Sequence, residues 1–277
     1  MDIKLIVSDI DHTILPSSQI ISPATYNAVR DCRARGVEFV IASGRWYPAA
    51  RKVAVDQLGI EGGYMIICNG GAVVRSDGTP LAQWRLSGEQ ARQIYELLKA
   101  EQVMMNAYAP DAIYRVRGQY LTVFRFPETS YFDGGASYRV VEGDWEGFER
   151  AVLDGPYKIE AYTDDTELLG KLRREIEKMG YQANSAFPFN LEIMAPGAGK
   201  GAAVRWLTAH MGLNRDQVMG FGDYTNDLPM LENVGWPVAV DNAIDEVKRA
   251  CRNVAPSCED DGVAQIINKY VLGDEQP

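Results

Sequence analysis

The chain of 277 residues is 46% hydrophobic, so it can bury one sizeable core or two unequal ones. Its formal net charge of -10 argues against nucleic acid and against an anionic membrane surface as the main partner. Four cysteines without zinc-ligand spacing and only two histidines exclude a zinc site and a histidine-rich metal site. A small anionic substrate stays compatible with this charge, because a metal ion and a few cations can reverse the field inside one pocket.

Neither a leader nor a membrane span is expected. The first seven residues are too short and too charged for a signal peptide. No apolar run approaches the roughly 18 residues that a membrane span needs. The sequence therefore predicts a cytoplasmic protein.

The first 70 residues alternate short apolar runs with amphipathic segments, which is typical of parallel β/α organisation. Ser22 followed by Pro23 is a helix start signal, since serine caps a helix and proline fits its first turn. Strands are predicted at residues 3–7, 39–41 and 64–68, and helices at 23–36 and up to about residue 59.

The pattern changes after residue 70. A hairpin is expected from strands at 72–75 and 82–85, because Asp77, Gly78 and Pro80 between them are turn formers. Further helices are predicted at 88–101, 145–153 and 166–179, and further strands within 112–126, at 158–162 and within 181–194. We predict that residues 84–188 form a separate, inserted α+β domain.

The β/α rhythm returns at Gly199. Helices are predicted at 200–210, 226–232, 244–251 and 262–271, and strands at 218–221 and 238–240. The predicted fold class is therefore α/β. Residues 1–83 and 189–277 would form a Rossmann-like core with a parallel sheet, and the α+β domain would be inserted into it.

Two groups of carboxylates follow predicted strands, where the ligand sites of open α/β sheets lie. Asp9 and Asp11 follow the first strand, and Asp223 and Asp227, with Asn226 between them, follow a later one. These acids would repel one another unless a hard cation such as Mg2+, which prefers oxygen ligands, lay among them. Asx turns or helix capping could explain either group alone, but the two groups together favour a metal site.

Two further segments suit an anionic substrate. Ser43 and Gly44 follow the strand at 39–41 and offer a hydroxyl and backbone N–H groups near a helix start. Lys200 begins a predicted helix, where a cation is unfavourable unless an anion lies close. A nucleotide-binding P-loop needs serine or threonine after its lysine, and Gly201 stands there instead, so a kinase is not supported.

These motifs, in this order and with a long insertion between Ser43 and Lys200, resemble those of the haloacid dehalogenase (HAD) superfamily. They look specifically like the Cof-type (subclass IIB) phosphatases, and the resemblance covers nearly the whole chain. It implies that residues 84–188 are a C2-type cap domain. It also implies a Mg2+-dependent phosphomonoesterase that hydrolyses small phosphorylated metabolites through an aspartyl-phosphate intermediate. Sugar phosphates are the default substrates, with pyridoxal phosphate and flavin mononucleotide as alternatives.

The resemblance also implies roles for the site residues. Asp9 would be the nucleophile and Asp11 the general acid and base. Mg2+ would be held by Asp9, by Asp223 and by the backbone carbonyl of Asp11, with Asp227 as a further or outer carboxylate. The phosphoryl oxygens would be bound by Ser43, Gly44, Lys200 and Asn226.

His12 departs from the family pattern, which usually has glycine at this position. Glycine there would permit a backbone angle that histidine adopts less readily. A tolerated substitution or a contact with the substrate would explain the histidine, and the first explanation is favoured.

Other functions stay open on the same scaffold. A dehalogenase would lack the second catalytic carboxylate, so Asp11 argues against one. A phosphomutase would keep both acids, and a catalytically silent metabolite-binding protein could keep the fold. Substrate specificity is expected in the inserted domain, which offers aromatic and basic side chains at Tyr108, Tyr114, Arg115, Arg117 and Tyr120. Such residues more often pack within strands or face solvent, so none of them is assigned a role.

Overall fold

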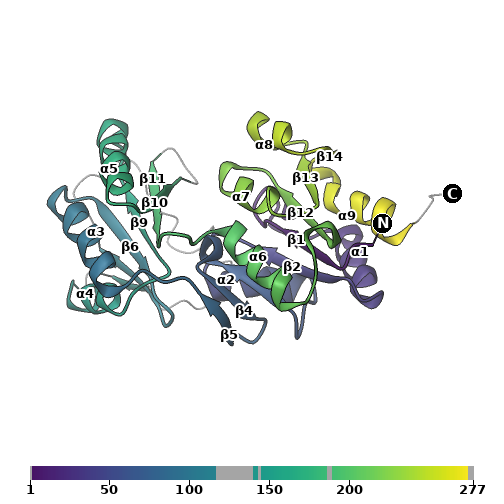
Figure 1. Cartoon of the computed structure of the whole chain (residues 1–277), viewed down its shortest axis with the longest axis horizontal. Helices are drawn as coiled ribbons and strands as arrows, with labels where there is room; N and C mark the ends of the chain where they lie inside the picture. The colour runs from purple at the N-terminus through teal and green to yellow at the C-terminus, as the bar shows by residue number, and fades with distance from the viewer. Residues whose placement is uncertain (1, 117–139, 143–144, 186–188, 274–277) are drawn as a thin grey trace. The chain divides into compact units, whose positions relative to one another are not determined.

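The structure is a computed structural model that describes residues 2–116, 140–142, 145–185 and 189–273 (Figure 1). Arg117 and Tyr120, two of the specificity candidates, lie outside the described residues. The chain divides into two compact units, the first formed by Met1–Ala82 and Gly199–Pro277 and the second by Gln83–Ala198. Each unit has its own sheet and is described by itself.

The described part of the first unit is built on a sheet of eight strands. Its strands are β1 Leu5–Ser8, β2 Glu38–Ala42, β3 Tyr64–Ile67, β4 Ala72–Arg75, β5 Pro80–Gln83, β12 Val218–Gly222, β13 Trp236–Val240 and β14 Asn253–Ala255. They lie in the order β14-β13-β12-β1-β2-β3-β4-β5, parallel from β14 to β3, with β4 antiparallel to β3. The apolar run Leu5, Ile6 and Val7 is fully buried, as a central parallel strand covered on both faces requires.

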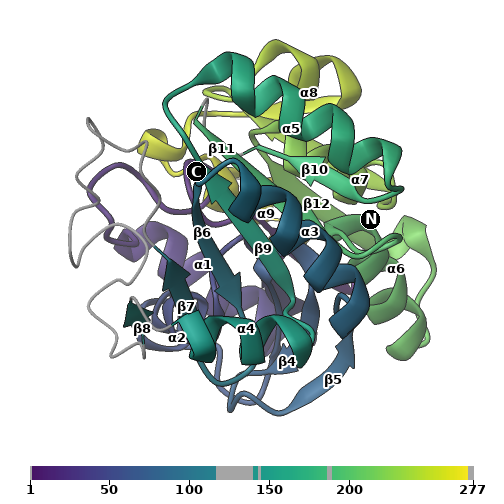
Figure 2. The same cartoon turned by 90° about the vertical axis from the view of Figure 1, so that its left-hand side faces the viewer.

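Helices cover both faces of this sheet. They are α1 Pro23–Ala34, α2 Tyr47–Arg51, α6 Lys200–His210, α7 Leu228–Leu231, α8 Asp245–Ala250 and α9 Gly262–Ile267. At the start of α1, the Ser22 hydroxyl accepts a hydrogen bond from the Thr25 N–H at 3.0 Å, which confirms the predicted cap. Helix α1 packs on α9, α6 packs on α7, and α1 and α6 lie on opposite faces of the sheet (Figures 1 and 2).

The position of β12 beside β1 places the acidic motifs together. The two strands are parallel, and Ser8 at the end of β1 pairs with Phe221 near the end of β12. The chain therefore leaves both strands at the same edge of the sheet, with Asp9 after one strand and Asp223 after the other.

The second unit has a mainly antiparallel sheet with helices on one face (Figure 2). Its strands are β6 Met104–Tyr108, β7 Ile113–Val116, β8 Val140–Glu142, β9 Lys158–Tyr162, β10 Gln182–Asn184 and β11 Asn190–Met194. Their order is β10-β11-β9-β6-β7-β8, and only the pair β7 and β8 is parallel among the described strands. The helices are α3 Gly88–Ala100, α4 Trp145–Leu153 and α5 Thr166–Lys178. Apolar side chains such as Met105, Ile159 and Ile193 share one core with α3, α4 and α5.

These two sheets confirm the predicted fold class, an α/β core with a separate α+β unit. The second strand of the predicted hairpin starts earlier than expected, at Pro80, because Arg75 N–H already bonds to the Thr79 carbonyl across the turn. The predicted strand-like stretch 181–194 contains two strands, β10 and β11, which pair antiparallel. Since β11 also pairs with β9, the second unit continues past residue 188 to Ala198.

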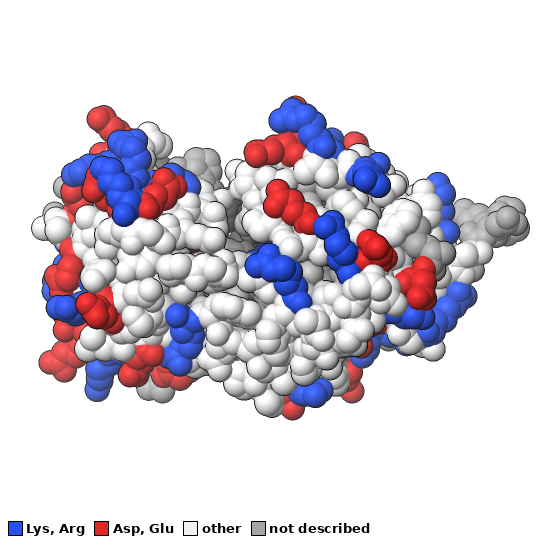
Figure 3. All heavy atoms as spheres, in the orientation of Figure 1, with Lys and Arg blue, Asp and Glu red and all other residues white. Residues whose placement is uncertain are grey.

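The surface carries both signs of charge. On the face shown in Figure 3, acidic and basic side chains are interspersed, and no continuous basic surface is visible among the described residues. None of the described helices combines the length and the apolar composition that crossing a bilayer requires.

Candidate active site

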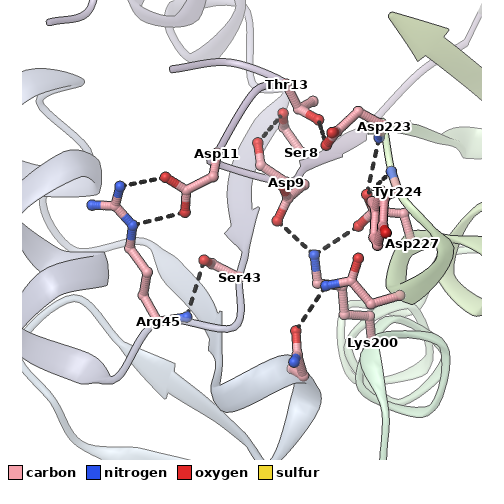
Figure 4. Close-up of polar contacts among 12 residues, drawn as sticks. Ser8, Asp9, Asp11, Thr13, Ser43, Arg45, Lys200, Asp223, Tyr224 and Asp227 are labelled. Carbon is pink, nitrogen blue, oxygen red and sulfur yellow. Dashed lines mark hydrogen bonds and ion pairs between the residues drawn. The ribbon is translucent and has the colours of Figure 1, made fainter. Parts of the chain in front are cut away.

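Three of the predicted acids meet at the carboxyl ends of β1 and β12. Asp9, Asp223 and Asp227 each offer a carboxylate oxygen, and these oxygens lie within 4.8 Å of one another (Figure 4). The Asp9 N–H bonds to the Phe221 carbonyl at 3.0 Å, so the backbone ladder between the two strands continues to the first acid. The register of the sheet therefore brings together side chains more than 200 positions apart in the sequence.

Lys200, the first residue of α6, bridges two of these acids. Its ammonium nitrogen lies 2.5 Å from Asp9 Oδ1 and 2.6 Å from Asp227 Oδ1, and the side chain is fully buried (Figure 4). Burial alone would lower the pKa of Lys200, but Asp227 and Asp9 outweigh it and raise the pKa above its usual value. Gly70, with φ of 88°, lets the loop before Lys200 come this close, because a Cβ there would lie 2.3 Å from the Gly199 backbone.

Asp227 fixes the turn after β12. One of its oxygens accepts from Lys200, and the other accepts from the backbone N–H groups of Asp223 at 3.0 Å and Tyr224 at 3.2 Å. Gly222 makes room for it, since a Cβ there would lie 2.5 Å from the Asp227 Cβ. Because both of its oxygens are engaged, Asp227 is suited to orient Lys200 and the Asp223 backbone.

The charge of this cluster is not balanced by its own residues. Burial raises the pKa of Asp9 well above its usual range in spite of Lys200, and Asp227 and Asp223 raise it further. Burial and Asp227 raise the pKa of Asp223 to about 6, although its Oδ1 accepts a hydrogen bond from Thr13 Oγ1 at 2.8 Å. The cluster holds three carboxylates and one ammonium group, which contacts Asp9 and Asp227. The second oxygens of Asp9 and Asp223 have no hydrogen-bond partner among the described residues. This donor set of hard oxygens fits Mg2+.

Ser43, Gly44 and Asn226, the residues predicted to bind phosphate with Lys200, are connected through Asn69. The Asn226 amide donates to Asn69 Oδ1 at 3.2 Å, and a Cβ at Gly44 would lie 3.1 Å from that same oxygen. The Asn69 N–H also donates to the Ser43 carbonyl at 2.8 Å. Asn69 was not among the predicted site residues, and its place before Gly70 and Gly71 was the available signal. In the structure it adopts a left-handed φ of 55°, which asparagine reaches more readily than most residues.

Asp11, the predicted acid and base, is turned away from the other acids. Its carboxylate points toward Arg45 and accepts from Nε at 2.9 Å and from Nη2 at 2.5 Å (Figure 4). Asp9 points instead toward Lys200 (Figure 4). Sequence reasoning did not single out Arg45, whose position two residues after Ser43 was the only signal.

His12 adopts a left-handed backbone with φ of 59°, the conformation that the glycine of the family pattern would favour. Its side chain is exposed, and its carbonyl accepts a hydrogen bond from the Asn242 amide at 2.6 Å. That bond helps to hold the turn that separates Asp11 from Thr13.

Comparisons with known proteins identify the family of this chain. The family model of haloacid dehalogenase-like hydrolases matches residues 6–267. A protein of Streptococcus pyogenes serotype M6 is 30% identical over 98% of this chain and 100% of its own length. The 5-amino-6-(5-phospho-D-ribitylamino)uracil phosphatase of Bacillus subtilis is 28% identical over 98% of this chain and 97% of its own.

Among solved structures, a subclass IIB sugar phosphatase of the HAD superfamily has the same fold. Its TM-score is 0.81 over 96% of this chain and 98% of its own, at 19% identity. The match over residues 6–267 agrees with the order of the motifs and with the architecture of both sheets. The chain belongs to the haloacid dehalogenase-like hydrolase family.

Proposed function

We propose that the protein is a Mg2+-dependent phosphomonoesterase that hydrolyses small phosphorylated metabolites through a phosphorylated Asp9. The observation that carries this proposal is the buried Asp9 carboxylate, bonded to Lys200 on one oxygen inside an acidic cluster at the carboxyl edge of a parallel sheet. A carboxylate at this edge of the sheet can act as the nucleophile. The ammonium group of Lys200 beside it is placed to contact a phosphoryl oxygen as well.

Two displacements would complete the reaction. In the first, an Asp9 oxygen bonds to phosphorus, the bond from phosphorus to the leaving oxygen breaks, and that oxygen takes a proton from Asp11. In the second, a water oxygen bonds to phosphorus and gives a proton to Asp11. The bond from phosphorus to Asp9 then breaks, which releases inorganic phosphate and restores the carboxylate. Lys200, Ser43 and Asn226 would donate hydrogen bonds to the phosphoryl oxygens throughout.

Carboxylates at the ends of β1 and β12 would supply most of the metal ligands. Asp9, Asp223 and the Asp11 backbone carbonyl would hold Mg2+, with Asp227 as an outer carboxylate that orients Lys200. When bound, Mg2+ would neutralise negative charge on the phosphoryl oxygens and on the acids themselves.

The substrate class is supported by a relative. The Bacillus subtilis relative is named for a substrate that carries its phosphate on a ribityl chain, which is an unactivated alkyl ester. We infer that this chain also acts on the alkyl phosphate of a sugar or polyol, with pyridoxal phosphate and flavin mononucleotide as alternatives. An alkoxide is a poor leaving group unless it is protonated, so the reaction needs a general acid, the role proposed for Asp11.

The test is turnover of p-nitrophenyl phosphate with and without Mg2+, by the wild type, Asp9→Asn and the exposed control Asp56→Asn. We expect Mg2+-dependent release of inorganic phosphate, a loss of at least about 10³-fold in Asp9→Asn and wild-type rates in the control. Acid quenching followed by mass spectrometry should find a phosphoryl group on the peptide that contains Asp9. Near-wild-type activity of Asp9→Asn would contradict the mechanism, and transfer of phosphate to a second position of the substrate would indicate a mutase.

A further inference from the structure

Arg45 forms a bidentate ion pair with Asp11 and has no role in the proposed reaction steps. Two parallel hydrogen bonds join the guanidinium group to both carboxylate oxygens, at 2.9 Å and 2.5 Å. The side chain of Arg45 is 5% exposed, whereas that of Asp11 is 30% exposed. The fork of Arg45 therefore lies behind the carboxylate, and part of Asp11 stays open to a reacting molecule.

Arg45 is itself held in place. Its N–H donates to the Ser43 hydroxyl at 3.1 Å, and its carbonyl accepts from the Cys68 N–H at 2.9 Å. Its Nη2 also donates to Gln19 Oε1 at 3.1 Å. The turn after β2 thus carries both a proposed phosphate ligand, Ser43, and the partner of the proposed acid, Asp11.

We propose that Arg45 is a positioning residue for Asp11. This inference rests on the proposed function, in which Asp11 gives a proton to the leaving oxygen and later takes one from water. Proton transfer needs the carboxylate within hydrogen-bond reach of the reacting oxygen, so its position and its rotation both matter. A planar two-bond fork fixes both, whereas the single-point ammonium group of a lysine fixes neither rotation nor approach.

A role in folding alone has a different consequence from a positioning role. Loss of a purely structural ion pair would lower stability and slow all substrates in proportion. Loss of acid positioning selectively slows substrates whose leaving group needs a proton. Phenyl phosphate and p-nitrophenyl phosphate are suitable probes, because they are similar in size while p-nitrophenolate leaves readily without a proton.

The experiment measures kcat/KM for both esters in Arg45→Met, Arg45→Lys, Asp11→Asn and the double variant Arg45→Met/Asp11→Asn. Arg51→Met is the matched control, because Arg51 makes an exposed ion pair on the surface. We expect Arg45→Met to lose about 10²-fold on phenyl phosphate, the lower end for acid–base catalysis, and less than about tenfold on p-nitrophenyl phosphate. Arg45→Lys should show the same selectivity, and the double variant should add no selective loss to that of Asp11→Asn.

Equal losses on the two esters in the Arg45 variants, or additive selective losses in the double variant, would overturn the proposal. If Asp11→Asn is selective and Arg45→Met is not, only the role of Arg45 is wrong. If Asp11→Asn is not selective either, the acid role of Asp11 in the proposed function fails with it. Thermal unfolding checks each variant. Should Arg45→Met not fold, Arg45→Lys and Gln19→Ala decide the question, with selective losses in both as the supporting result.

Discussion

Each unit of the molecule buries one lysine between two carboxylates. In the first unit Lys200 contacts Asp9 and Asp227. In the second unit Lys158 lies 2.6 Å from Glu160 and 3.1 Å from Glu192. The two groups have similar composition, but they differ in how the charge of the buried carboxylates is compensated.

In the second unit, neighbouring protein groups compensate the charge of the two buried glutamates. Glu160 and Glu192 pair directly across β9 and β11, an arrangement that two ionised carboxylates would destabilise. Burial works to raise the pKa of Glu160, but Lys158 and the hydroxyls of Tyr162 and Tyr108 outweigh it, so its pKa is lowered. Burial raises the pKa of Glu192 to about 7, so this second acid can keep a proton.

The first unit has no such internal balance. Asp223 adds a third carboxylate beside Asp9 and Asp227, and the cluster lies where parallel strands end. Within the described residues, oxygens of Asp9 and Asp223 stay available for a cation. A buried lysine between two acids is therefore not evidence of a site by itself. Unbalanced charge with available oxygens at the carboxyl ends of strands is the better indicator.

Of the two buried lysines, the lysine of the first unit should have the larger effect. Lys200→Ala should lose about 10²- to 10³-fold in kcat, because a charge that stabilises the transition state is removed, and added Mg2+ should not restore it. Asp223→Asn keeps an oxygen ligand but loses its charge, so part of its activity should return at high Mg2+ by mass action. Initial rates over a Mg2+ titration test both variants. Rescue of Lys200→Ala by the metal would mean that the two roles are assigned the wrong way round.

The lysine of the second unit should matter for stability. Lys158→Met leaves two buried carboxylates without their cation and should cost about 3 kcal/mol in the free energy of unfolding. Lys178→Met, at an exposed pair with Glu175, is the matched control and should change it by less than about 0.5 kcal/mol. Urea denaturation measures both variants. Equal stability of the two would show that the Lys158 cluster is not coupled to folding.

A smaller and pH-dependent effect is expected at Glu192. Between pH 4.5 and about 7 the unfolded carboxyl is ionised while the folded one keeps its proton, so this group lowers wild-type stability as pH rises through that window. Glu192→Gln has no such proton to lose. Relative to wild type it should gain roughly 2 kcal/mol between pH 5 and pH 8. Urea denaturation at both pH values, with the exposed Glu177→Gln as control, measures the gain, and a pH-independent difference would contradict it.

Part of the fold and of the site could be predicted from the sequence, because the causes of those features are local. Ser22 and Pro23 start a helix by their own chemistry, and the apolar run of β1 requires burial on both faces. The approach of Asp9 and Asp223 was also predictable, since parallel strands end at a common edge of the sheet. A backbone angle that favours glycine at His12 was expected from the family pattern.

Other features were decided only by the tertiary structure. The direction of Asp11 depends on Arg45, 34 positions later, and that of Asn226 depends on Asn69, 157 positions earlier. In the second unit, Glu160 looks like any polar residue of a strand until the register of β11 sets it against Glu192. The sequence by itself determined which segments form strands and helices and which strand ends carry acids, because periodicity and capping act between near neighbours. Only the tertiary structure decided which charge faces which, because side-chain direction and burial depend on contacts between segments that are far apart in the chain.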